Sequence, residues 1–431
     1  MAEPFITPMP PVAEGVGLPW DVDIADPVAA LAAARERCGD TFVVDSGDDR
    51  YLFTVDPVGV AAFYALPEER ASKGAADWRM LRRKLPDELF VGRRTLPAAL
   101  FGRDDVATYL ANVDRALDAS LVELGPEGRV DCFALSRRIA HRVGLASWGG
   151  PGAADGHRFD RLVAAFDQLD GSEAFVHPDA MAAVAASGQR DERAALAAVT
   201  VELTDALSEL QGHEVDHPLF TRVASAWDDV PDQERAAGVA ADVALIHVAS
   251  MSNLFAALGW MLVDLVEHPA EQAKVRSGDP ALAERAALES TRLAQRSLMA
   301  RYVLKPVALE VGSGVLDISP GVTVATLLPL TNTSAAPGLD TWDPDRWRRR
   351  RLADTGSLAA VELVTVFGHG RHTCPAQPFS LSAMVTAATR LLDAYDLRAA
   401  WEGRPVPVPA QIGGVARAAA PCPVEYRARV G

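Results

Sequence analysis

Cys374 is the residue best placed to do chemistry, because it lies between a turn with two glycines and an apolar helix expected over residues 380–392. Gly368 and Gly370 let the backbone fold tightly around the sulfur. Backbone N–H groups at a helix N-terminus can stabilise a thiolate and tune an iron bound to it. The pattern predicts a thiolate ligand to a haem iron. The alternative is an ordinary buried cysteine after a glycine turn.

Residues 367–376 resemble the haem-binding signature of the cytochrome P450 family, F-x-x-G-x-[RH]-x-C-x-[GA]. The constrained positions are all matched, by Phe367, Gly370, His372, Cys374 and Ala376. The resemblance implies that Cys374 is the metal ligand of haem b, iron protoporphyrin IX. It also implies that Phe367 shields the sulfur, that Gly370 belongs to the cofactor-binding turn, and that His372 reaches a haem propionate.

Upstream of the cysteine, Glu289 and Arg292 form an E-x-x-R pair, whose i,i+3 spacing places both charges on one helical face. Alone, such a pair is usually a solvated ion pair. The P450 family carries it between a long core helix and the cysteine loop. A third partner comes from a P-[ED]-R-[FW] element, which residues 344–347 match. The resemblance implies that Glu289, Arg292 and Arg346 form one network on the proximal side of the haem, and that Arg301 contacts a second propionate.

In most P450s the long core helix carries [AG]-G-x-[DE]-T above the iron, because cleaving the O–O bond needs an acid and an alcohol to deliver protons. Counting back from the helix end at Pro269, the equivalent stretch is 249–253, with Ala249 next to the haem. Ser252 replaces the acid and Asn253 replaces the threonine. As candidate catalytic residues, Ser252 can carry a proton through water and Asn253 can bond dioxygen or an ordered water. The alternative is that Asn253 only satisfies a kink in the helix.

An amide at this position resembles the P450 branch that contains cholesterol 7α-hydroxylase and prostacyclin synthase, and is also seen in allene oxide synthases. A further similarity to the sterol-hydroxylase part of that branch is the stretch 292–301, which lacks the usual prolines. The first of these enzymes hydroxylates, whereas the other two rearrange peroxides. Two reaction classes therefore stay open. One is O2-dependent oxygenation, and the other is redox-neutral rearrangement or dehydration, or use of peroxide.

Two further features of the sequence have alternative interpretations. His247, about two turns before Asn253 on the same helix, is either a substrate-pocket residue or a core histidine bonded to a carbonyl. The arginines of 93–103 either contact a propionate or form a solvated basic patch.

The elements that position these residues are mostly helices, predicted from apolar periodicity and from Gly and Pro breaks. The expected helices are Val106–Leu124, Cys132–Trp148, Asp160–Leu169, Asp191–Gln211, Asp216–Asp228, Pro231–His268, Pro280–Leu298 and Met384–Leu397. Strand-rich segments are expected as a hairpin of Thr41–Val44 with Tyr51–Val55, over Pro306–Val324, and as a closing hairpin within Pro405–Val430.

This order, without βαβ repetition, indicates a mainly α, α+β architecture. By the resemblance it is the P450 fold, a helical body around the haem with small β-sheets. We expect a single domain over residues 1–431, in which 1–19 are an extended leader.

Composition restricts the class of protein. Apolar residues make up 49% and charged residues 23% of 431, which suits a folded enzyme with a large core. The net charge of −16 disfavours nucleic acid and anionic membranes as partners. No run approaches the roughly 18 uninterrupted apolar residues of a membrane span, and no secretory signal is recognisable, so we expect a cytoplasmic protein. The cysteines are far apart, which argues against a disulfide framework or a structural zinc site.

The resemblance implies a monooxygenase that oxidises a mostly apolar small molecule, in bacterial secondary metabolism, with O2 and two electrons. A separate ferredoxin or flavodoxin with its reductase is the expected donor, because the chain has no room for such a domain. Basic residues Arg348–Arg351 and Arg371 are candidates for contacting an acidic donor. A haem-binding sensor without catalysis is a third, disfavoured hypothesis.

Overall fold

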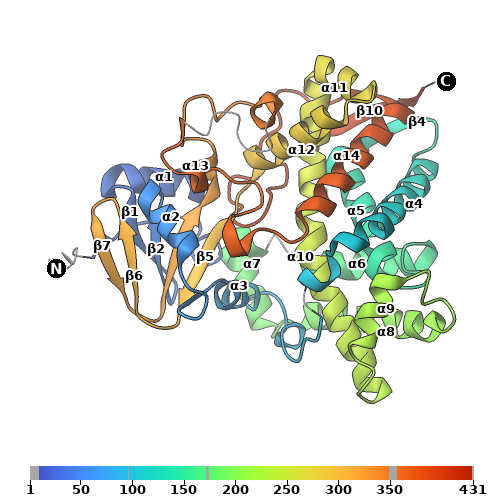
Figure 1. Cartoon of the computed structure of the whole chain (residues 1–431), viewed down its shortest axis with the longest axis horizontal. Helices are drawn as coiled ribbons and strands as arrows, with labels where there is room; N and C mark the ends of the chain where they lie inside the picture. Colours follow the sequence, from blue (N-terminus) through green and yellow to red (C-terminus); the bar gives the residue numbers. More distant parts are fainter. Residues whose placement is uncertain (1–8, 96, 171–173, 349–356, 430–431) are drawn as a thin grey trace.

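The longest helix of the computed structural model, α10 (Asp232–Glu267), passes through the middle of a helical body (Figure 1). Residues 254–266 of α10 are buried on every face, as their apolar sequence predicts. Pro269 ends the helix and begins the next one, because proline has no N–H for the helix and fits its first turn. The structure describes residues 9–95, 97–170, 174–348 and 357–429.

Helices surround α10 on the right of Figure 1, and a β-rich part lies on the left. The other described α-helices are α1 (Pro27–Cys38), α2 (Pro57–Ala65), α3 (Lys73–Leu81), α4 (Val106–Leu124), α5 (Cys132–Trp148), α6 (Gly156–Asp170), α7 (Pro178–Ala186), α8 (Arg190–Leu210), α9 (Pro218–Ser225), α11 (Pro269–Arg276), α12 (Pro280–Ala294), α13 (Leu328–Asn332) and α14 (Gln377–Ala394). Helix α10 packs on α5, α8 and α12.

The predicted helix bounds agree best with the structure for α4 and α5. Helices α4 and α5 have the predicted bounds, and Asp131 caps α5 by accepting a hydrogen bond from the N–H of Ala134. Three predicted helices are too long at their C-terminal ends by three or four residues, namely α9, α12 and α14. Helix α12 ends at Ala294, because Leu298 already begins a strand, and α14 ends at Ala394 for the same reason.

The strands of the described residues form three small sheets. They are β1 (Thr41–Ser46), β2 (Asp49–Thr54), β3 (Ala71–Ser72), β4 (Glu127–Asp131), β5 (Leu298–Val303), β6 (Val307–Val311), β7 (Gly314–Ile318), β8 (Val322–Leu327), β9 (Tyr395–Ala399) and β10 (Pro423–Ala428). The largest sheet has the order β1-β2-β8-β5-β3, in which only β2 and β8 are parallel. The predicted hairpin of β1 and β2 is present, with Thr41 opposite Thr54.

The predicted closing hairpin within 405–430 is present as a short antiparallel pairing that does not include β10. Val408 N–H donates to the Arg417 carbonyl at 2.8 Å, and Ala419 N–H donates to the Val406 carbonyl at 2.9 Å, on either side of a bridge between Pro407 and Ala418. Strand β10 pairs instead with β4 and β9, in a sheet of order β4-β10-β9. The reason is that β4 and β9 offer longer partners than the proline-rich residues that precede β10.

The described part of the leader, residues 9–19, lies along β1. Ala13 N–H donates to the Val43 carbonyl at 2.8 Å, and Val43 N–H donates to the Pro11 carbonyl at 2.9 Å. The rest of the predicted leader, 1–8, is outside the described residues.

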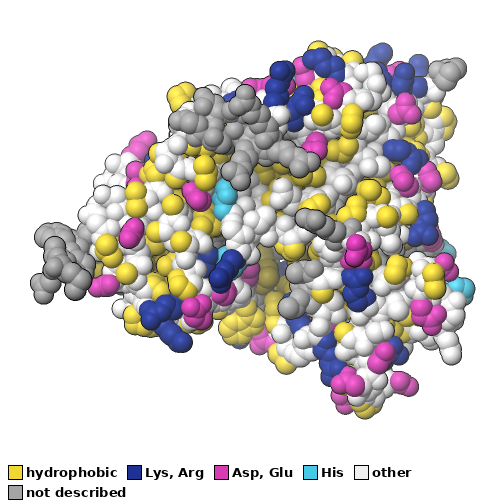
Figure 2. All heavy atoms as spheres, in the orientation of Figure 1, with side chains coloured by type: hydrophobic (Ala, Val, Ile, Leu, Met, Phe, Trp, Pro, Cys, Tyr) yellow, Lys and Arg dark blue, Asp and Glu magenta, His cyan; other side chains and the backbone are white. Residues whose placement is uncertain are grey.

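Among the described helices, α10 alone is long and apolar enough to cross a membrane by length and composition. Its most apolar window is 72% buried inside the protein, which is typical of a core helix. On the face drawn in Figure 2, acidic and basic side chains are interspersed.

Candidate active site

A cavity of about 570 Å³ lies between α10, the cysteine loop and the start of α14. Its lining is mostly apolar or small, with a few charged groups, and comes from segments distant in sequence. The lining residues are Lys73, Asp77, Phe101, Ala249, Ser250, Asn253, Leu254, Ala257, Thr291, Gln295, Ser297, Met299, Leu328, Val366, Phe367, Gly368, His372, Cys374, Pro375, Ala376, Ser380, Met384 and Val415. Cys374 and Asn253, both predicted from sequence, therefore face one space.

The loop that carries Cys374 depends on glycine. Gly368 has φ +79°, and a Cβ there would lie 2.8 Å from the His372 carbonyl oxygen. Gly370 has φ +62° at the start of a short 3-10 turn over Gly370–His372. The Cys374 N–H donates to the Phe367 carbonyl at 2.8 Å, which closes the loop and brings Phe367 beside the cysteine in the cavity wall.

The thiol of Cys374 is partly buried at the N-terminus of α14. Burial raises the pKa of the Cys374 thiol above its ordinary value. Hydrogen bonds from the backbone of Ala376 and Gln377 and the charge of Lys73 lower the pKa but do not cancel that effect. The backbone N–H groups of Ala376 and Gln377 are the donors that the sequence analysis predicted around the sulfur. A metal cation bound to the sulfur removes the proton outright.

Helix α10 has one break in its buried surface, and that break faces the cavity. Ala249 and Asn253, four residues apart, are exposed in the middle of a helix whose other residues there are mostly buried. Ser250 lines the same wall, whereas Ser252 is partly buried and is absent from the lining. At 100° per residue, 249, 250 and 253 share a face that 252 does not. The structure thus brings Asn253 but not Ser252 to the cavity. Ser250, which sequence reasoning missed, could have been found from the helical periodicity, because it shares a face with 249 and 253.

Asn253 is bound to a distant loop. Its Oδ1 accepts a hydrogen bond from the backbone N–H of Val415 at 2.8 Å, and its Nδ2 is 3.5 Å from the Ala249 carbonyl. No local sequence pattern marks Val415, because the contact joins residues far apart in the chain.

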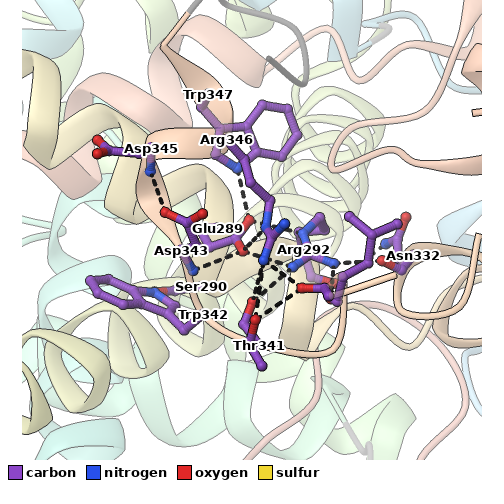
Figure 3. A network of polar contacts seen from close by, with 12 residues as sticks. Glu289, Ser290, Arg292, Asn332, Thr341, Trp342, Asp343, Asp345, Arg346 and Trp347 are labelled. Atoms are coloured by element: carbon purple, nitrogen blue, oxygen red, sulfur yellow. Dashed lines mark hydrogen bonds and ion pairs between the residues drawn. The ribbon is translucent and has the colours of Figure 1, made fainter. Parts of the chain in front are cut away.

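Glu289, Arg292 and Arg346 lie together behind the cysteine loop (Figure 3). Arg292 donates to both oxygens of Glu289, at 2.9 and 2.7 Å, and Arg346 donates to Oε1 at 3.0 Å. Trp347 Nε1 donates to Oε2 at 2.9 Å. The side chains of Glu289 and Arg292 are both 0% exposed. The three charged residues therefore form one buried network, in which Arg292 also donates to the Leu339 carbonyl at 2.7 Å.

The comparisons with known proteins agree on one family. Among curated proteins, cytochrome P450 monooxygenase cdmJ from Talaromyces verruculosus is 31% identical over 117 residues, which are 26% of this chain and 22% of that protein. No family model matches the chain. Among solved structures, retinoic acid-bound cyanobacterial CYP120A1 matches with a TM-score of 0.75 at 16% identity, over 98% of this chain and 100% of that one.

The chain has the cytochrome P450 fold. The sequence relative and the structural neighbour are both cytochrome P450s, and the mainly α prediction is confirmed. The narrower resemblance to the branch of cholesterol 7α-hydroxylase and prostacyclin synthase stays a prediction.

A P450 fold implies a haem, and the residues around the cavity fit one. Cys374 supplies a thiol held by backbone N–H groups, and small Ala249 leaves the wall of α10 open in front of it. Among the described residues there is no cluster of three His, Cys, Asp or Glu side chains suited to a metal ion. The cysteine that the sequence predicts as the metal ligand, Cys374, lines the cavity.

The basic residues predicted at the propionates lie close together, but only one lines the cavity. His372 lines it, and its Nε2 lies 3.2 Å from Glu68 Oε2 without hydrogen-bond geometry. Arg301 is buried and donates to the carbonyls of Leu66 at 2.8 Å and Tyr64 at 3.2 Å, and it is 3.7 Å from Glu68. Lys73, which sequence reasoning missed, lines the cavity in an ion pair with a neighbouring aspartate.

Arg93 and Arg94 both lie near acidic side chains. Arg93 is 3.7 Å from Asp242 of α10, and Arg94 pairs with Asp229. Neither arginine lines the cavity. In the described part of 93–103, a surface and anchoring role for these arginines is favoured over a propionate contact.

His247 does not line the P450 cavity and does not bond a carbonyl. It is 1% exposed and lies in a chain of buried polar groups. Because Trp148 Nε1 can only donate, His247 Nδ1 must accept this bond of 3.2 Å. His247 Nε2 then donates to His141 Nδ1 at 2.8 Å, and His141 Nε2 donates to Asp167 at 3.0 Å. His247 is thus a neutral core histidine.

We expect this histidine to make the protein sensitive to acid. Burial and then the charge of His141 hold the pKa of His247 well below 6.5, so the folded state keeps it neutral while the unfolded state takes up a proton. Its contribution to stability is therefore complete above the unfolded pKa and falls as the pH drops below about 6.5, by up to about 1.4 kcal/mol per pH unit. Urea unfolding at a series of pH values measures this slope.

The variant His247→Phe keeps the aromatic ring but removes the titrating group. It should be less stable near neutral pH by about 1–3 kcal/mol, because Trp148 Nε1 loses its acceptor. Its free energy of unfolding should then fall less steeply between about pH 6.5 and 5. An unchanged slope would show that His247 is not the group that titrates.

Proposed function

We propose that this protein is a haem-thiolate monooxygenase that oxidises a mostly apolar small molecule. The observation that carries the proposal is that Cys374 and the exposed residues of α10, Ala249 and Asn253, line one cavity in a P450 fold. Haem b, bound through sulfur, supplies the activation of O2 in such a site. In the overall reaction one oxygen atom enters the substrate, and the other leaves as water with two electrons and two protons.

The chain's own residues hold and orient this group. Cys374 is the proposed metal ligand, with Phe367 beside it and Gly370 in the cofactor-binding turn. His372 and Lys73 are the basic side chains that line the cavity, so we propose them as the residues that face the propionates. The predicted contact of Arg301 stays a proposal, and it requires that this side chain give up carbonyl partners.

Substrate class follows from the lining. Phe101, Leu254, Met299 and Leu328 present apolar surface, which suits a largely hydrocarbon molecule. The structural neighbour is a retinoic acid-bound protein, and that ligand too is mostly apolar. We place the reaction in bacterial secondary metabolism in the cytoplasm, as the sequence suggested.

Electrons come from a separate ferredoxin or flavodoxin with its reductase. Arg371 is exposed and lies three residues before Cys374. We propose that an acidic donor docks on this side of the cysteine loop. Arg348 is exposed and paired with Asp345, and Arg349–Arg351 are outside the described residues.

A second candidate function is a redox-neutral rearrangement or dehydration, or the use of peroxide. It is favoured by one observation, that no carboxylate of α10 is among the residues lining the cavity, and Asp77 of α3 lies there in an ion pair with Lys73. General acid assistance is typically worth about 10²–10⁴ in rate, so its loss would slow oxygenation more than rearrangement.

Product formation under two gas conditions separates the two candidates. A monooxygenase needs O2, a donor protein and its reductase, and incorporates one atom from labelled O2 into the product. We expect no product anaerobically without donors. Undiminished product under those conditions, measured by mass spectrometry, would support the rearranging enzyme and reject the monooxygenase.

A further inference from the structure

The orientation of the Asn253 amide is fixed by its partner. The backbone N–H of Val415 can only donate, so the atom 2.8 Å from it must be the oxygen of the amide. The NH2 group therefore lies on the other side, where it donates to the Ala249 carbonyl at 3.5 Å. At that distance the bond is weak. The NH2 group thus keeps donor capacity for the cavity that Asn253 lines.

The loop around Val415 is built to hold this contact. Arg296 N–H donates to the Gly414 carbonyl and Gly413 N–H donates to the Arg296 carbonyl, both at 2.8 Å. Gly414 has φ +64°, and a Cβ there would lie 2.4 Å from Asn253 Oδ1. These two bonds anchor the loop to the segment after α12, and the missing Cβ makes room for the amide oxygen. Rotation of the amide would place NH2 against the Val415 N–H, two donors facing each other.

We infer that Val415 positions Asn253 as a hydrogen-bond donor into the cavity, and that the site selects substrates with an acceptor oxygen, such as a ketone, ether or peroxide, near the reacting atom. This inference rests on the proposed function. An amide held in this way donates but cannot accept, so it differs from an alcohol, which can relay a proton by doing both. Val415 is a positioning residue and Asn253 is the group that meets the substrate.

Carbon monoxide is a probe of this donor. Bound to the ferrous haem of the full-length protein, it has a C–O stretching frequency that falls when a donor approaches its oxygen. Asn253→Leu and Asn253→Asp should both raise the frequency relative to wild type. The aspartate keeps an acceptor for Val415, so it separates loss of the donor from loss of the loop contact. Thr291→Val is the matched control, because Thr291 lines the cavity but its hydroxyl donates to the Ala287 carbonyl at 2.7 Å.

Val415→Pro tests the positioning role. It removes the N–H that holds the amide and leaves the Asn253 side chain in place. We expect more than one C–O band, because the amide then populates both orientations, with a melting curve that shows the fold is kept. If neither variant of Asn253 moves the band, the inference is wrong, even if Val415→Pro misfolds. If the wild type forms no thiolate-ligated carbon monoxide complex, the proposed function fails as well.

The binding affinities for 2-undecanone, a ketone, and for undecane, an alkane of the same length, test the substrate class. Wild type should bind the ketone more tightly, and Asn253→Asp should lose about tenfold in affinity for the ketone, which corresponds to one unsatisfied hydrogen bond of about 1.4 kcal/mol. Affinity for the alkane should change little. A wild-type protein that binds the ketone no better than the alkane would contradict the assignment.

Discussion

Replacing Glu289 with alanine is expected to give protein that unfolds readily and retains little haem. Arg292, Arg346, Trp347 and the N–H of Asp343 all donate to this carboxylate. The variant leaves the guanidinium of Arg292 buried without its counter-charge. Removing one partner of a buried pair costs about 3–5 kcal/mol. That is a large part of the roughly 5–15 kcal/mol that holds a typical domain folded.

Urea unfolding and haem content per chain measure this loss. Glu284→Ala is the matched control, since Glu284 is on the same helix, is partly exposed and makes no hydrogen bond or ion pair with another described residue. Its free energy of unfolding should stay within about 0.5 kcal/mol of wild type. Equal stability of the two variants would mean that the network is not needed for folding.

The parts of the site that were predictable are those encoded locally. The E-x-x-R pair has its geometry fixed by helical spacing, and the glycines around Cys374 lie within a few residues of it. The bounds of α4 and α5 followed from periodicity, and α5 also begins at a capping aspartate, Asp131. The predictions agree with the structure here because each of these features is formed by residues close together in the sequence.

The parts that were missed depend on contacts between distant segments. Val415 and Lys73 reach the cavity from a C-terminal loop and from α3, and no local pattern marks either. Ser252 was expected at the cavity because it occupies the position of the acid in the family motif. In the structure the helix turns residues 249, 250 and 253 toward the cavity, and Ser252 is not among the lining residues.

Helices α1 and α2 were not predicted, although each begins with a readable signal. Asp26 and Asp56 precede prolines, and each side chain accepts a hydrogen bond from the backbone N–H three residues later. Both helices are short, and each buries one face. Alanine and other apolar residues also lie on their remaining faces, so the sequences show little one-sided apolar pattern. The apolar periodicity therefore did not predict these two helices, whereas the capping residues Asp26 and Asp56 could have done so.

Cys374→Ser is expected to abolish thiolate ligation of the haem. Cys374 would supply the sulfur ligand of the haem iron, whereas a serine hydroxyl is neither as soft as a thiolate nor ionised at neutral pH. The loop should still form, since its closing bond is between the backbone of residue 374 and the Phe367 carbonyl. Loss of the ligand should therefore change the spectrum without unfolding the protein.

Cys132→Ser is the matched control, because Cys132 is buried at the start of α5 and is absent from the lining of the cavity. This variant should keep the wild-type spectrum. A change of spectrum in it would indicate that spectral effects report general damage to the fold.

The carbon monoxide difference spectrum of the reduced protein, compared between wild type and Cys374→Ser, tests the central claim most directly. The account predicts the band of thiolate-ligated ferrous haem in wild type and its absence in Cys374→Ser, with similar melting curves. The same band in both proteins, or no such band in haem-loaded wild type, would contradict Cys374 as the ligand and the haem-thiolate function with it.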